Sequence, residues 1–433
     1  MSSASGLPTR FKVPAAERRL RIAVVYGRMP LPMTRADQMT VAHFIAYLSA
    51  RGHRVDLFAL DTGEPLSSTQ QDWLADRCGR VDVVRQRPWQ SVLGALAALV
   101  RGRPLQVGWF TNRRQTRRLR EAIAADGYDI VYTYYLRSAE AVRGIATAGR
   151  PQAEGMPATF LALQLSQSLN ARRIAEHSTR LRDKLVYGVE WRLLRRYEAR
   201  IWRAFRRTVL IGKCDLEEVA AACRERGEPV IDNHLVCAHG VDIERFRPRP
   251  ELVEPATVVF SGVMRTNTNI EAIGWFVRNC WARVKEQVPD ARLLIVGRSP
   301  PPQVQAFAQK YPDITVTGEV PDLADYIARA AVCINPMQAG AGMQNKLIEY
   351  LASAKPVVAT PVANEGVQAK AGEHLLIAAT PEEFSAAVVR LLEEPQSGAA
   401  LGAAGRRFIE STWTWEKLFA ELETAFLAEA GVG

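Results

Sequence analysis

The chain has 433 residues, of which 48% are hydrophobic and 24% are charged, a composition typical of soluble globular proteins and not of disordered or collagen-like chains. The net charge of +10 is unevenly divided, because residues 1–240 carry 38 Lys and Arg against 23 Asp and Glu, whereas residues 241–433 carry 18 against 23. The length predicts two domains, and the charge difference predicts that they bind different partners.

Targeting and redox signals are weak. The first 19 residues predict a flexible leader and lack the apolar centre of a secretory signal. The apolar run of residues 91–100 (SVLGALAALV) ends at Arg101, short of the roughly 18 residues of a membrane-spanning helix. We therefore expect a cytoplasmic protein. The six cysteines lie apart without C-x-x-C spacing, which argues against a disulfide framework or a zinc site.

The first half of the chain alternates strand and helix. Residues 20–26 (LRIAVVY) are typical of a buried parallel strand. Apolar residues then recur at helical spacing over 41–48, Gly52 ends this helix, and 54–60 form the next strand. This order predicts a right-handed crossover and a parallel sheet. Later strands are predicted at 128–134, 158–163 and 207–211, with a mostly helical stretch before the last.

Arginines are concentrated in residues 101–120 and 172–207. The aromatic residues among them are Trp191, Tyr197, Trp202 and Phe205. Such a surface attracts nucleic acid, anionic lipid or a phosphorylated substrate. No nucleic-acid-binding motif accompanies it, so we expect no nucleic-acid partner and favour an amphipathic helix on an anionic membrane, at the inner face of the cytoplasmic membrane. The alternative is a solvated helical face whose arginines pair with Glu190 and Glu198.

A turn-rich segment at 236–250 predicts the domain boundary, after which strand and helix alternate again. Strands are expected at 257–260, 292–296, 314–317, 332–335, 356–360 and 375–377. The fold class is therefore α/β, with two Rossmann-like doubly wound domains whose ligands bind in a cleft at the carboxyl ends of the strands.

The segment 334–367 combines a strand, a glycine loop, a helix and a second strand. The loop holds Gly340, Ala341 and Gly342, and Lys346 lies near the start of the helix. Unpaired amides at a helix N-terminus, together with a lysine, suit phosphate oxygens. A tight turn with close helix packing is the alternative interpretation.

Several motifs of the second half resemble one family. These motifs are HGVDIERFRPRP at the boundary, FSGVMRTNTN after the first strand, VTGEVPDLADYIARAAVCINP, and NKLIEYLASAKPVVATP. They are similar to those of the glycosyltransferases with two Rossmann-like domains (GT-B), in particular the retaining family 4 (group 1) enzymes of bacterial polysaccharide synthesis.

The resemblance implies a domain organisation. Residues 1–19 would be the leader, 20–240 an acceptor-binding domain with a basic, membrane-facing surface, and 241–410 a nucleotide-sugar-binding domain. Residues 411–433 would form a helix that crosses back to the first domain.

The resemblance also implies a UDP- or GDP-sugar as donor, with no cofactor and no metal. By position, the catalytic residues Arg265 and Lys346 would stabilise the departing diphosphate, and Glu349 would accept hydrogen bonds from the ribose. The other donor-binding residues implied are Gly262, Arg298, Gly318, Val320, Gly340, Ala341, Gly342 and Asn345. Ala341 stands where the family's E-x7-E pattern has its first acid, so one usual contact to the donor sugar is missing.

On the acceptor side, three charged residues follow predicted strands. Arg28 and Asp37 lie after the first strand, and Arg137 follows YDIVYTYY. Each is a candidate for contacting the acceptor, and each could instead be a helix cap or a surface ion pair.

The expected function is hexosyl transfer, retaining and metal-independent, to a glycan or polyprenyl-diphosphate-linked acceptor in polysaccharide or cell-surface glycan synthesis. Two alternatives stay open. Ala341 would also fit a non-catalytic sugar-nucleotide-binding scaffold, and the same fold would fit a nucleotide-sugar epimerase, which needs acid and base carboxylates in the cleft.

Overall fold

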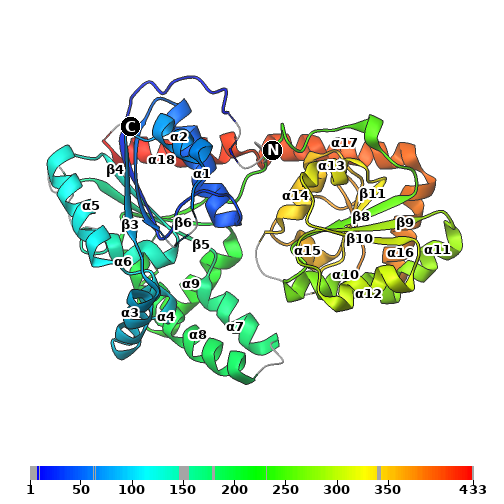
Figure 1. The fold of residues 1–433 in the computed structure, drawn as a ribbon, viewed down its shortest axis with the longest axis horizontal. Coiled ribbons are helices and arrows are strands. Elements are labelled where there is room, and N and C mark those ends of the chain that lie inside the picture. The colour runs from blue at the N-terminus through cyan, green and yellow to red at the C-terminus, as the bar shows by residue number, and fades with distance from the viewer. Residues whose placement is uncertain are drawn as a thin grey trace. The chain divides into compact units, whose positions relative to one another are not determined.

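The structure is a computed structural model that describes residues 7–8, 10–61, 63, 65–145, 156–177, 181–230, 232–338 and 343–431. It divides into two compact units (Figure 1). The amino-terminal unit comprises Gly6–Ala238 and Leu418–Gly433, and the carboxyl-terminal unit contains His239–Lys417. Both are α/β units built on a parallel sheet, as the sequence predicts.

The sheet of the amino-terminal unit has the strand order β3-β2-β1-β4-β5-β6-β7, and every neighbouring pair is parallel. The strands are β1 (Arg21–Tyr26), β2 (Arg54–Asp61), β3 (Arg80–Arg85), β4 (Ile130–Tyr134), β5 (Ala158–Gln164), β6 (Arg207–Leu210) and β7 (His234–Val236). The order reverses between β1 and β4, and ligands of doubly wound folds bind at such a switch point, beyond the carboxyl ends of the strands.

Nine helices of the described chain belong to this part of the sequence. They are α1 (Ala36–Ala50), α2 (Ser68–Arg77), α3 (Pro88–Val100), α4 (Leu105–Trp109), α5 (Arg113–Asp126), α6 (Ala139–Val142), α7 (Gln167–His177), α8 (Leu181–Ile201) and α9 (Lys213–Glu225). Within the described ranges, no helix has the length and apolarity to cross a membrane.

The helix α18 (Trp415–Glu429) packs on the amino-terminal unit, as the resemblance implies. Its Phe426 ring lies 4.5 Å from the Phe160 ring and 5.9 Å from the Phe44 ring, centroid to centroid. Its buried Glu423 carboxylate accepts hydrogen bonds from the Tyr47 hydroxyl at 2.7 Å and from His53 Nε2 at 2.8 Å. An apolar contact and a buried polar contact therefore both hold α18 in place.

In the arginine-rich stretch 172–207, three of the four aromatic residues named above are buried and cannot face a membrane. Trp202 and Phe205 are fully buried, and Tyr197 is 7% exposed, because they pack in the core of the unit. The alternative pairing is also wrong. Glu190 and Glu198 are buried and accept hydrogen bonds from backbone amides. The arginines pair instead with other acids, Arg195 with Glu218 and Glu225, and Arg200 and Arg203 with Glu228.

The sheet of the carboxyl-terminal unit has the order β10-β9-β8-β11-β12-β13, again parallel throughout. Its strands are β8 (Thr257–Ser261), β9 (Arg292–Val296), β10 (Ile314–Gly318), β11 (Val332–Asn335), β12 (Val357–Ala359) and β13 (Leu376–Ile377). Its helices are α10 (Asn267–Asn279), α11 (Trp281–Gln287), α12 (Pro302–Lys310), α13 (Leu323–Ala328), α14 (Asn345–Ala352), α15 (Pro361–Asn364), α16 (Pro381–Glu393) and α17 (Pro395–Thr412). The switch point of this sheet lies between β8 and β11.

Candidate functional site

Three glycines meet at the carboxyl edge of the second sheet, where Gly262 and Gly297 directly follow β8 and β9 and Gly318 is the last residue of β10. The Gly262 amide donates to the Val296 carbonyl at 3.0 Å, and the Gly297 amide donates to the Gly318 carbonyl at 3.1 Å. Gly297 has a φ of +149°, and a Cβ at this position would overlap the Gly262 carbonyl oxygen. Glycine permits this close approach of backbones. Two predicted donor residues, Gly262 and Gly318, therefore belong to one patch of backbone.

Lys346 lies in the first turn of α14 and points back to this edge. Its Nζ donates to Asn269 Oδ1 at 2.6 Å and lies 4.3 Å from the centre of the Phe260 ring. The residue is only 9% exposed. Asn269 and the Phe260 ring therefore cover the ammonium. Burial lowers the pKa of Lys346 to about 7, although Glu349 acts in the opposite direction.

Glu349 follows Lys346 on α14 and carries the opposite shift. Burial raises the pKa of Glu349 to about 7, against the effect of Arg245 and Lys346. Arg245 is itself held by Asp322, at 2.9 Å. Within the described part of the chain, the Glu349 carboxylate has no hydrogen bond or ion pair, so its oxygens are available to accept hydrogen bonds from a ligand.

Asn335 ends β11 and is fully buried. Neither its Oδ1 nor its Nδ2 has a hydrogen-bond partner among the described residues, and buried amides rarely lack partners. Asn335 was not predicted from the sequence as a site residue. The signal was an asparagine that closes an apolar strand just before a glycine loop. The predicted loop residues Gly340, Ala341 and Gly342 lie outside the described residues.

The other predicted donor residues lie near the same edge but are held differently. Arg265 is exposed in the turn between β8 and α10, without an ion pair among the described residues. The Arg298 carbonyl, just after β9, accepts from the Met264 amide at 3.1 Å. Val320 is half-buried against the core after β10, and Asn345 is the first residue of α14.

In the amino-terminal unit, the three predicted acceptor residues come together at the switch point. The Arg28 guanidinium lies 3.7 Å from the Asp37 carboxylate. Arg28 and Arg137 both lie over the Phe110 ring, at 5.4 and 5.3 Å from its centre. Arg137 also donates to Gln106 Oε1 at 2.9 Å. Phe110 was not predicted, and nothing in its sequence neighbourhood marks it.

This cluster has an excess of positive charge. Burial opposes ionisation of Asp37, but Arg28 and the Tyr26 hydroxyl hold its pKa below the ordinary value. Arg35 adds a third guanidinium, 3.2 Å from the same carboxylate. Burial lowers the pKa of Arg137, and the neighbouring Arg28 acts in the same direction. Because the cluster contains three guanidiniums and only one carboxylate, it favours an additional anion.

Two neighbouring residues have a strained backbone. Tyr135, after β4, has a φ of +72°, and Gln164, the last residue of β5, has a φ of +66°. Bulky residues rarely adopt this conformation outside sites where the surroundings impose it. Gln164 Oε1 is buried without a partner among the described residues, and the Tyr135 hydroxyl accepts from Gln167 Nε2 at 2.9 Å. Backbone strain of this kind cannot be inferred from residue type.

Comparison with known proteins bears on both units. Residues 255–394 match the family described as glycosyl transferases group 1. An uncharacterised protein of the cps region of Klebsiella pneumoniae is 20% identical over 411 residues, which cover 93% of this chain and 98% of that protein.

Two solved structures are similar over nearly the whole chain. Sucrose-phosphate synthase from Thermosynechococcus elongatus has a TM-score of 0.65 at 18% identity and covers 95% of this chain and 99% of its own. Anabaena HepE in complex with UDP has a TM-score of 0.61 at 12% identity and covers 94% and 100%. The chain therefore has the GT-B fold, and the part of it that matches the group 1 glycosyl transferases is residues 255–394.

Proposed function

We propose that the protein transfers a hexosyl group from a UDP- or GDP-sugar to a hydroxyl of a glycan or lipid-linked glycan in the synthesis of a polysaccharide or other cell-surface glycan. The group 1 match and the similar protein from a cps region support this class of reaction. The observation that carries it is Lys346, a buried cation at the start of α14, next to the backbone patch of Gly262 and Gly318.

In the proposed reaction, the acceptor oxygen bonds to the anomeric carbon while the bond from that carbon to the diphosphate breaks. The diphosphate leaves with the bonding electrons, and its oxygen takes up the proton that the acceptor hydroxyl loses. Lys346 and Arg265 would stabilise the growing negative charge, which is usually the largest catalytic contribution in such a step. Metal independence belongs to the proposal, because these two cations would replace a divalent metal. Retention of the anomeric configuration is also part of the proposal.

Glu349 would bind the ribose of the donor. Its carboxylate is one turn from Lys346 and lacks a partner among the described residues, so both ribose hydroxyls can donate to it. Asn335 would meet the donor as well, because an unpartnered buried amide at the switch point of the sheet has one acceptor and two donor hydrogens to offer.

The acceptor would carry an anionic group, such as the diphosphate of a polyprenyl carrier. Support comes from the cluster of Arg28, Arg35 and Arg137, in which Arg28 and Arg35 pair with the single carboxylate of Asp37 and Arg137 lies over the same Phe110 ring as Arg28. A peripheral location at the inner face of the cytoplasmic membrane fits this acceptor class and the excess of 15 positive charges in residues 1–240. A non-catalytic scaffold, the alternative that Ala341 favours, would bind the donor without transfer.

The test is a thermal-shift panel of the protein with UDP, GDP, ADP and their common sugar conjugates. A ligand present at 100 times its Kd stabilises the folded state by about 2.7 kcal/mol. We expect one diphosphate to shift the melting temperature selectively. Absence of a shift with every nucleotide contradicts the proposal, and donor binding without transfer or slow donor hydrolysis favours the scaffold.

A further inference from the structure

Helix α3 has the reverse of the usual amphipathic pattern. Its large apolar residues are exposed, with Trp89, Leu93, Leu96 and Val100 exposed by 55%, 57%, 55% and 89%. Val92 and Leu99 lie on the same face, because the six positions recur every three to four residues. We call these six residues the apolar row. The buried residues of the helix are the small Ser91, Ala95 and Ala98.

The packing of α3 keeps the apolar row on the outside. A Cβ at Gly94 or at Gly108 would overlap the carbonyl oxygen of the other, so the backbones of α3 and α4 touch. Gln86 Nε2 fixes the same helix face by donating to Ser91 Oγ at 3.1 Å and to the Trp109 carbonyl at 3.0 Å. The helix cannot roll its large side chains inward without separating from α4.

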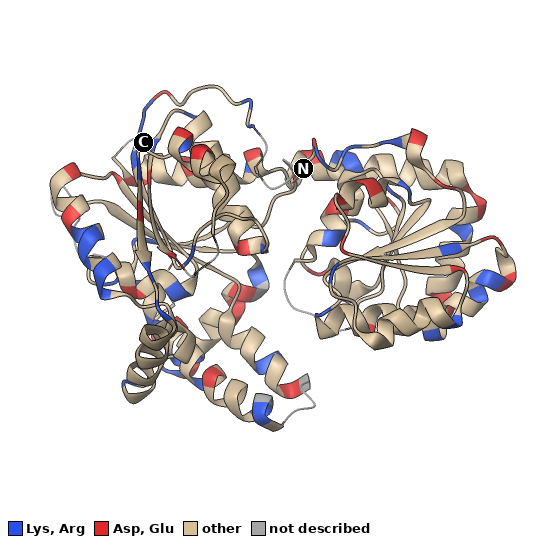
Figure 2. Ribbon diagram, viewed as in Figure 1, with Lys and Arg blue, Asp and Glu red and all other residues tan. Residues whose placement is uncertain are grey.

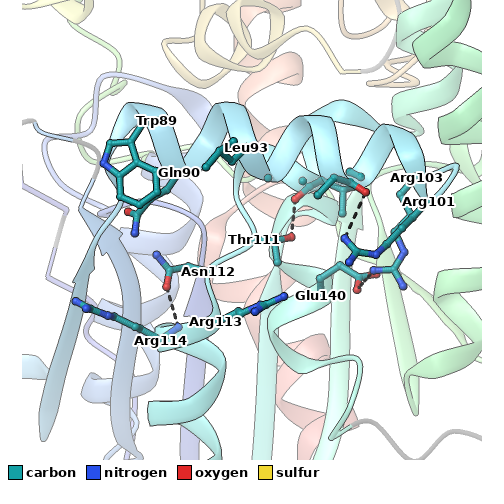
Figure 3. Close-up of a pocket in the computed structure, with 15 residues that line it drawn as sticks. Trp89, Gln90, Leu93, Arg101, Arg103, Thr111, Asn112, Arg113, Arg114 and Glu140 are labelled. Carbon is teal, nitrogen blue, oxygen red and sulfur yellow. Dashed lines mark hydrogen bonds and ion pairs between the residues drawn. The ribbon is translucent and has the colours of Figure 1, made fainter.

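Cations border the apolar row, although α3 itself has no charged residue (Figure 2). A cavity of about 590 Å³ lies beside it, with apolar walls from α3 and four arginines around it (Figure 3). Of these, Arg103 pairs with Glu140 at 2.7 Å and Arg101 donates to the carbonyl of Ala97. The guanidiniums of the other two, Arg113 and Arg114, have no ion pair among the described residues.

A second exposed apolar row follows on α8. Leu181, Leu185, Val186 and Val189 are exposed by 78%, 71%, 46% and 48%. The helix is connected to the α3 and α4 pair, because Glu190 of α8 accepts from the amides that begin α4. In Figure 1, α3, α4 and α8 lie beyond the same end of the sheet of the amino-terminal unit.

We infer that α3 is the membrane-docking helix of the protein and that its partner is a bilayer with anionic headgroups. The apolar row lies among the upper acyl chains, Trp89 sits at the interface, and Arg113 and Arg114 contact headgroup phosphates. The row covers 12 residues, about 18 Å of helix at 1.5 Å per residue. An apolar row beside unpaired cations fits an anionic bilayer better than a purely apolar protein surface. The inference rests on the peripheral location in the proposed function and not on the transfer reaction.

The experiment is sedimentation of the full chain with vesicles of phosphatidylcholine, alone or with one third phosphatidylglycerol. We expect the protein to bind the mixed vesicles about tenfold more tightly than the neutral ones. The double variant Leu93→Asp/Leu96→Asp should lower binding to the mixed vesicles about tenfold or more. Both residues are exposed, so the fold is expected to persist.

The matched control is Leu252→Asp/Val253→Asp, which replaces two residues of the carboxyl-terminal unit that are each 40% exposed. This control should bind vesicles within about twofold of the unmodified protein, because it introduces the same charge elsewhere. Arg113→Glu/Arg114→Glu should remove the preference for anionic vesicles. The nucleotide-induced thermal shift of each variant checks the fold. If the unmodified protein shows no such shift, that result contradicts the proposed function, whereas vesicle binding still tests whether α3 is the docking helix.

Three outcomes would overturn the inference. The first is vesicle binding by Leu93→Asp/Leu96→Asp equal to that of the unmodified protein. The second is no binding of the unmodified protein even at low salt. The third is a concentration-dependent dimer that the double variant abolishes, without any binding to vesicles. The apolar row would then be an interface between two copies of the chain.

Discussion

The Tyr350 hydroxyl accepts a hydrogen bond from the Ser261 amide at 2.7 Å. Tyr350 lies one turn beyond Lys346 on α14, so this contact fastens the helix to the end of β8 next to the ring over which the lysine lies. The position of α14 therefore does not depend on the charge of Lys346. A substitution of this lysine can test the charge while the backbone stays in place.

Lys346→Met should weaken the binding of the nucleoside diphosphate about 10- to 100-fold, because a charged hydrogen bond contributes about 1.5–3 kcal/mol. The melting temperature should stay within about 3 °C or rise, since the variant removes a buried cation whose pKa burial has lowered. Isothermal titration and thermal unfolding measure the two effects. Unchanged affinity would contradict the assignment of the phosphate site.

Nucleotide binding should take up a proton at pH 8. In the free protein the pKa of Lys346 is about 7, so the amine is mostly neutral at pH 8. An adjacent diphosphate favours the charged form and raises this pKa, and affinity should therefore fall as the pH rises from 7 to 9. Titration calorimetry in buffers of different ionisation enthalpy measures the uptake. Lys346→Met should show none, and equal uptake in both proteins would exclude this lysine as its source.

Arg137→Gln should weaken anion binding in the amino-terminal unit and leave the donor site intact. With UDP saturating the donor site, pyrophosphate serves as the probe. We expect its affinity to fall about tenfold or more, because a bidentate, charge-assisted contact is lost. Arg192→Gln, an exposed arginine of the same unit, is the control. Equal pyrophosphate binding by Arg137→Gln and the control would remove the cluster as an acceptor site.

Glu198→Ala should destabilise the amino-terminal unit by about 2–3 kcal/mol, because the buried carboxylate satisfies the first amides of α7. The Glu198 oxygens accept from the Gln167 amide and from the Ser168 hydroxyl, both at 2.6 Å. Urea unfolding measures the loss, with Glu121→Ala, an exposed glutamate of α5, as the control. A loss equal to that of the control would show that water replaces the carboxylate.

The same glutamate predicts a pH dependence of stability. Burial raises the pKa of Glu198 to about 7, above the ordinary value near 4.5. The folded state then binds more protons than the unfolded state between these values, so the contribution of Glu198 is full below about pH 4.5 and declines as the pH rises through about 7. Urea unfolding of the unmodified protein and of Glu198→Ala gives the free energy of unfolding of each at pH 5 and pH 8. The difference between the two proteins should depend on pH as described.

The parallel sheets could be predicted because buried parallel strands are continuous apolar runs, as in LRIAVVY before Gly27 and in residues 292–296. The edge strand β3 could not, because only alternate residues of it are buried. Burial of Lys346 depends on Asn269, 77 residues away in sequence. The burial of Trp202 and Phe205 could not be predicted, because the arginines around them suggest an exposed segment. Arginine can pack its methylene groups on a protein core while its guanidinium stays in solvent.

In the candidate site, too, local features could be predicted from the sequence and features that depend on tertiary packing could not. Positions such as Gly262 and Glu349 could be carried over from motifs, since these are short and local. The cluster of Arg28, Asp37 and Arg137 was found only as separate residues at strand ends. Arg28 and Arg137 meet over the Phe110 ring, and this contact depends on tertiary packing, which cannot be inferred from residue types.

The place of α18 constrains the order in which the protein can be made. The segments Gly6–Ala238 and Leu418–Gly433 form one unit, but the ribosome must synthesise the whole carboxyl-terminal unit between them. Until then, Phe44 and Phe160 lack the Phe426 ring that covers them. Domains commonly fold as they emerge, yet this one must wait with apolar surface uncovered. If synthesis stops within residues 239–417, the released chain exposes this apolar surface, which chaperones and proteases can bind.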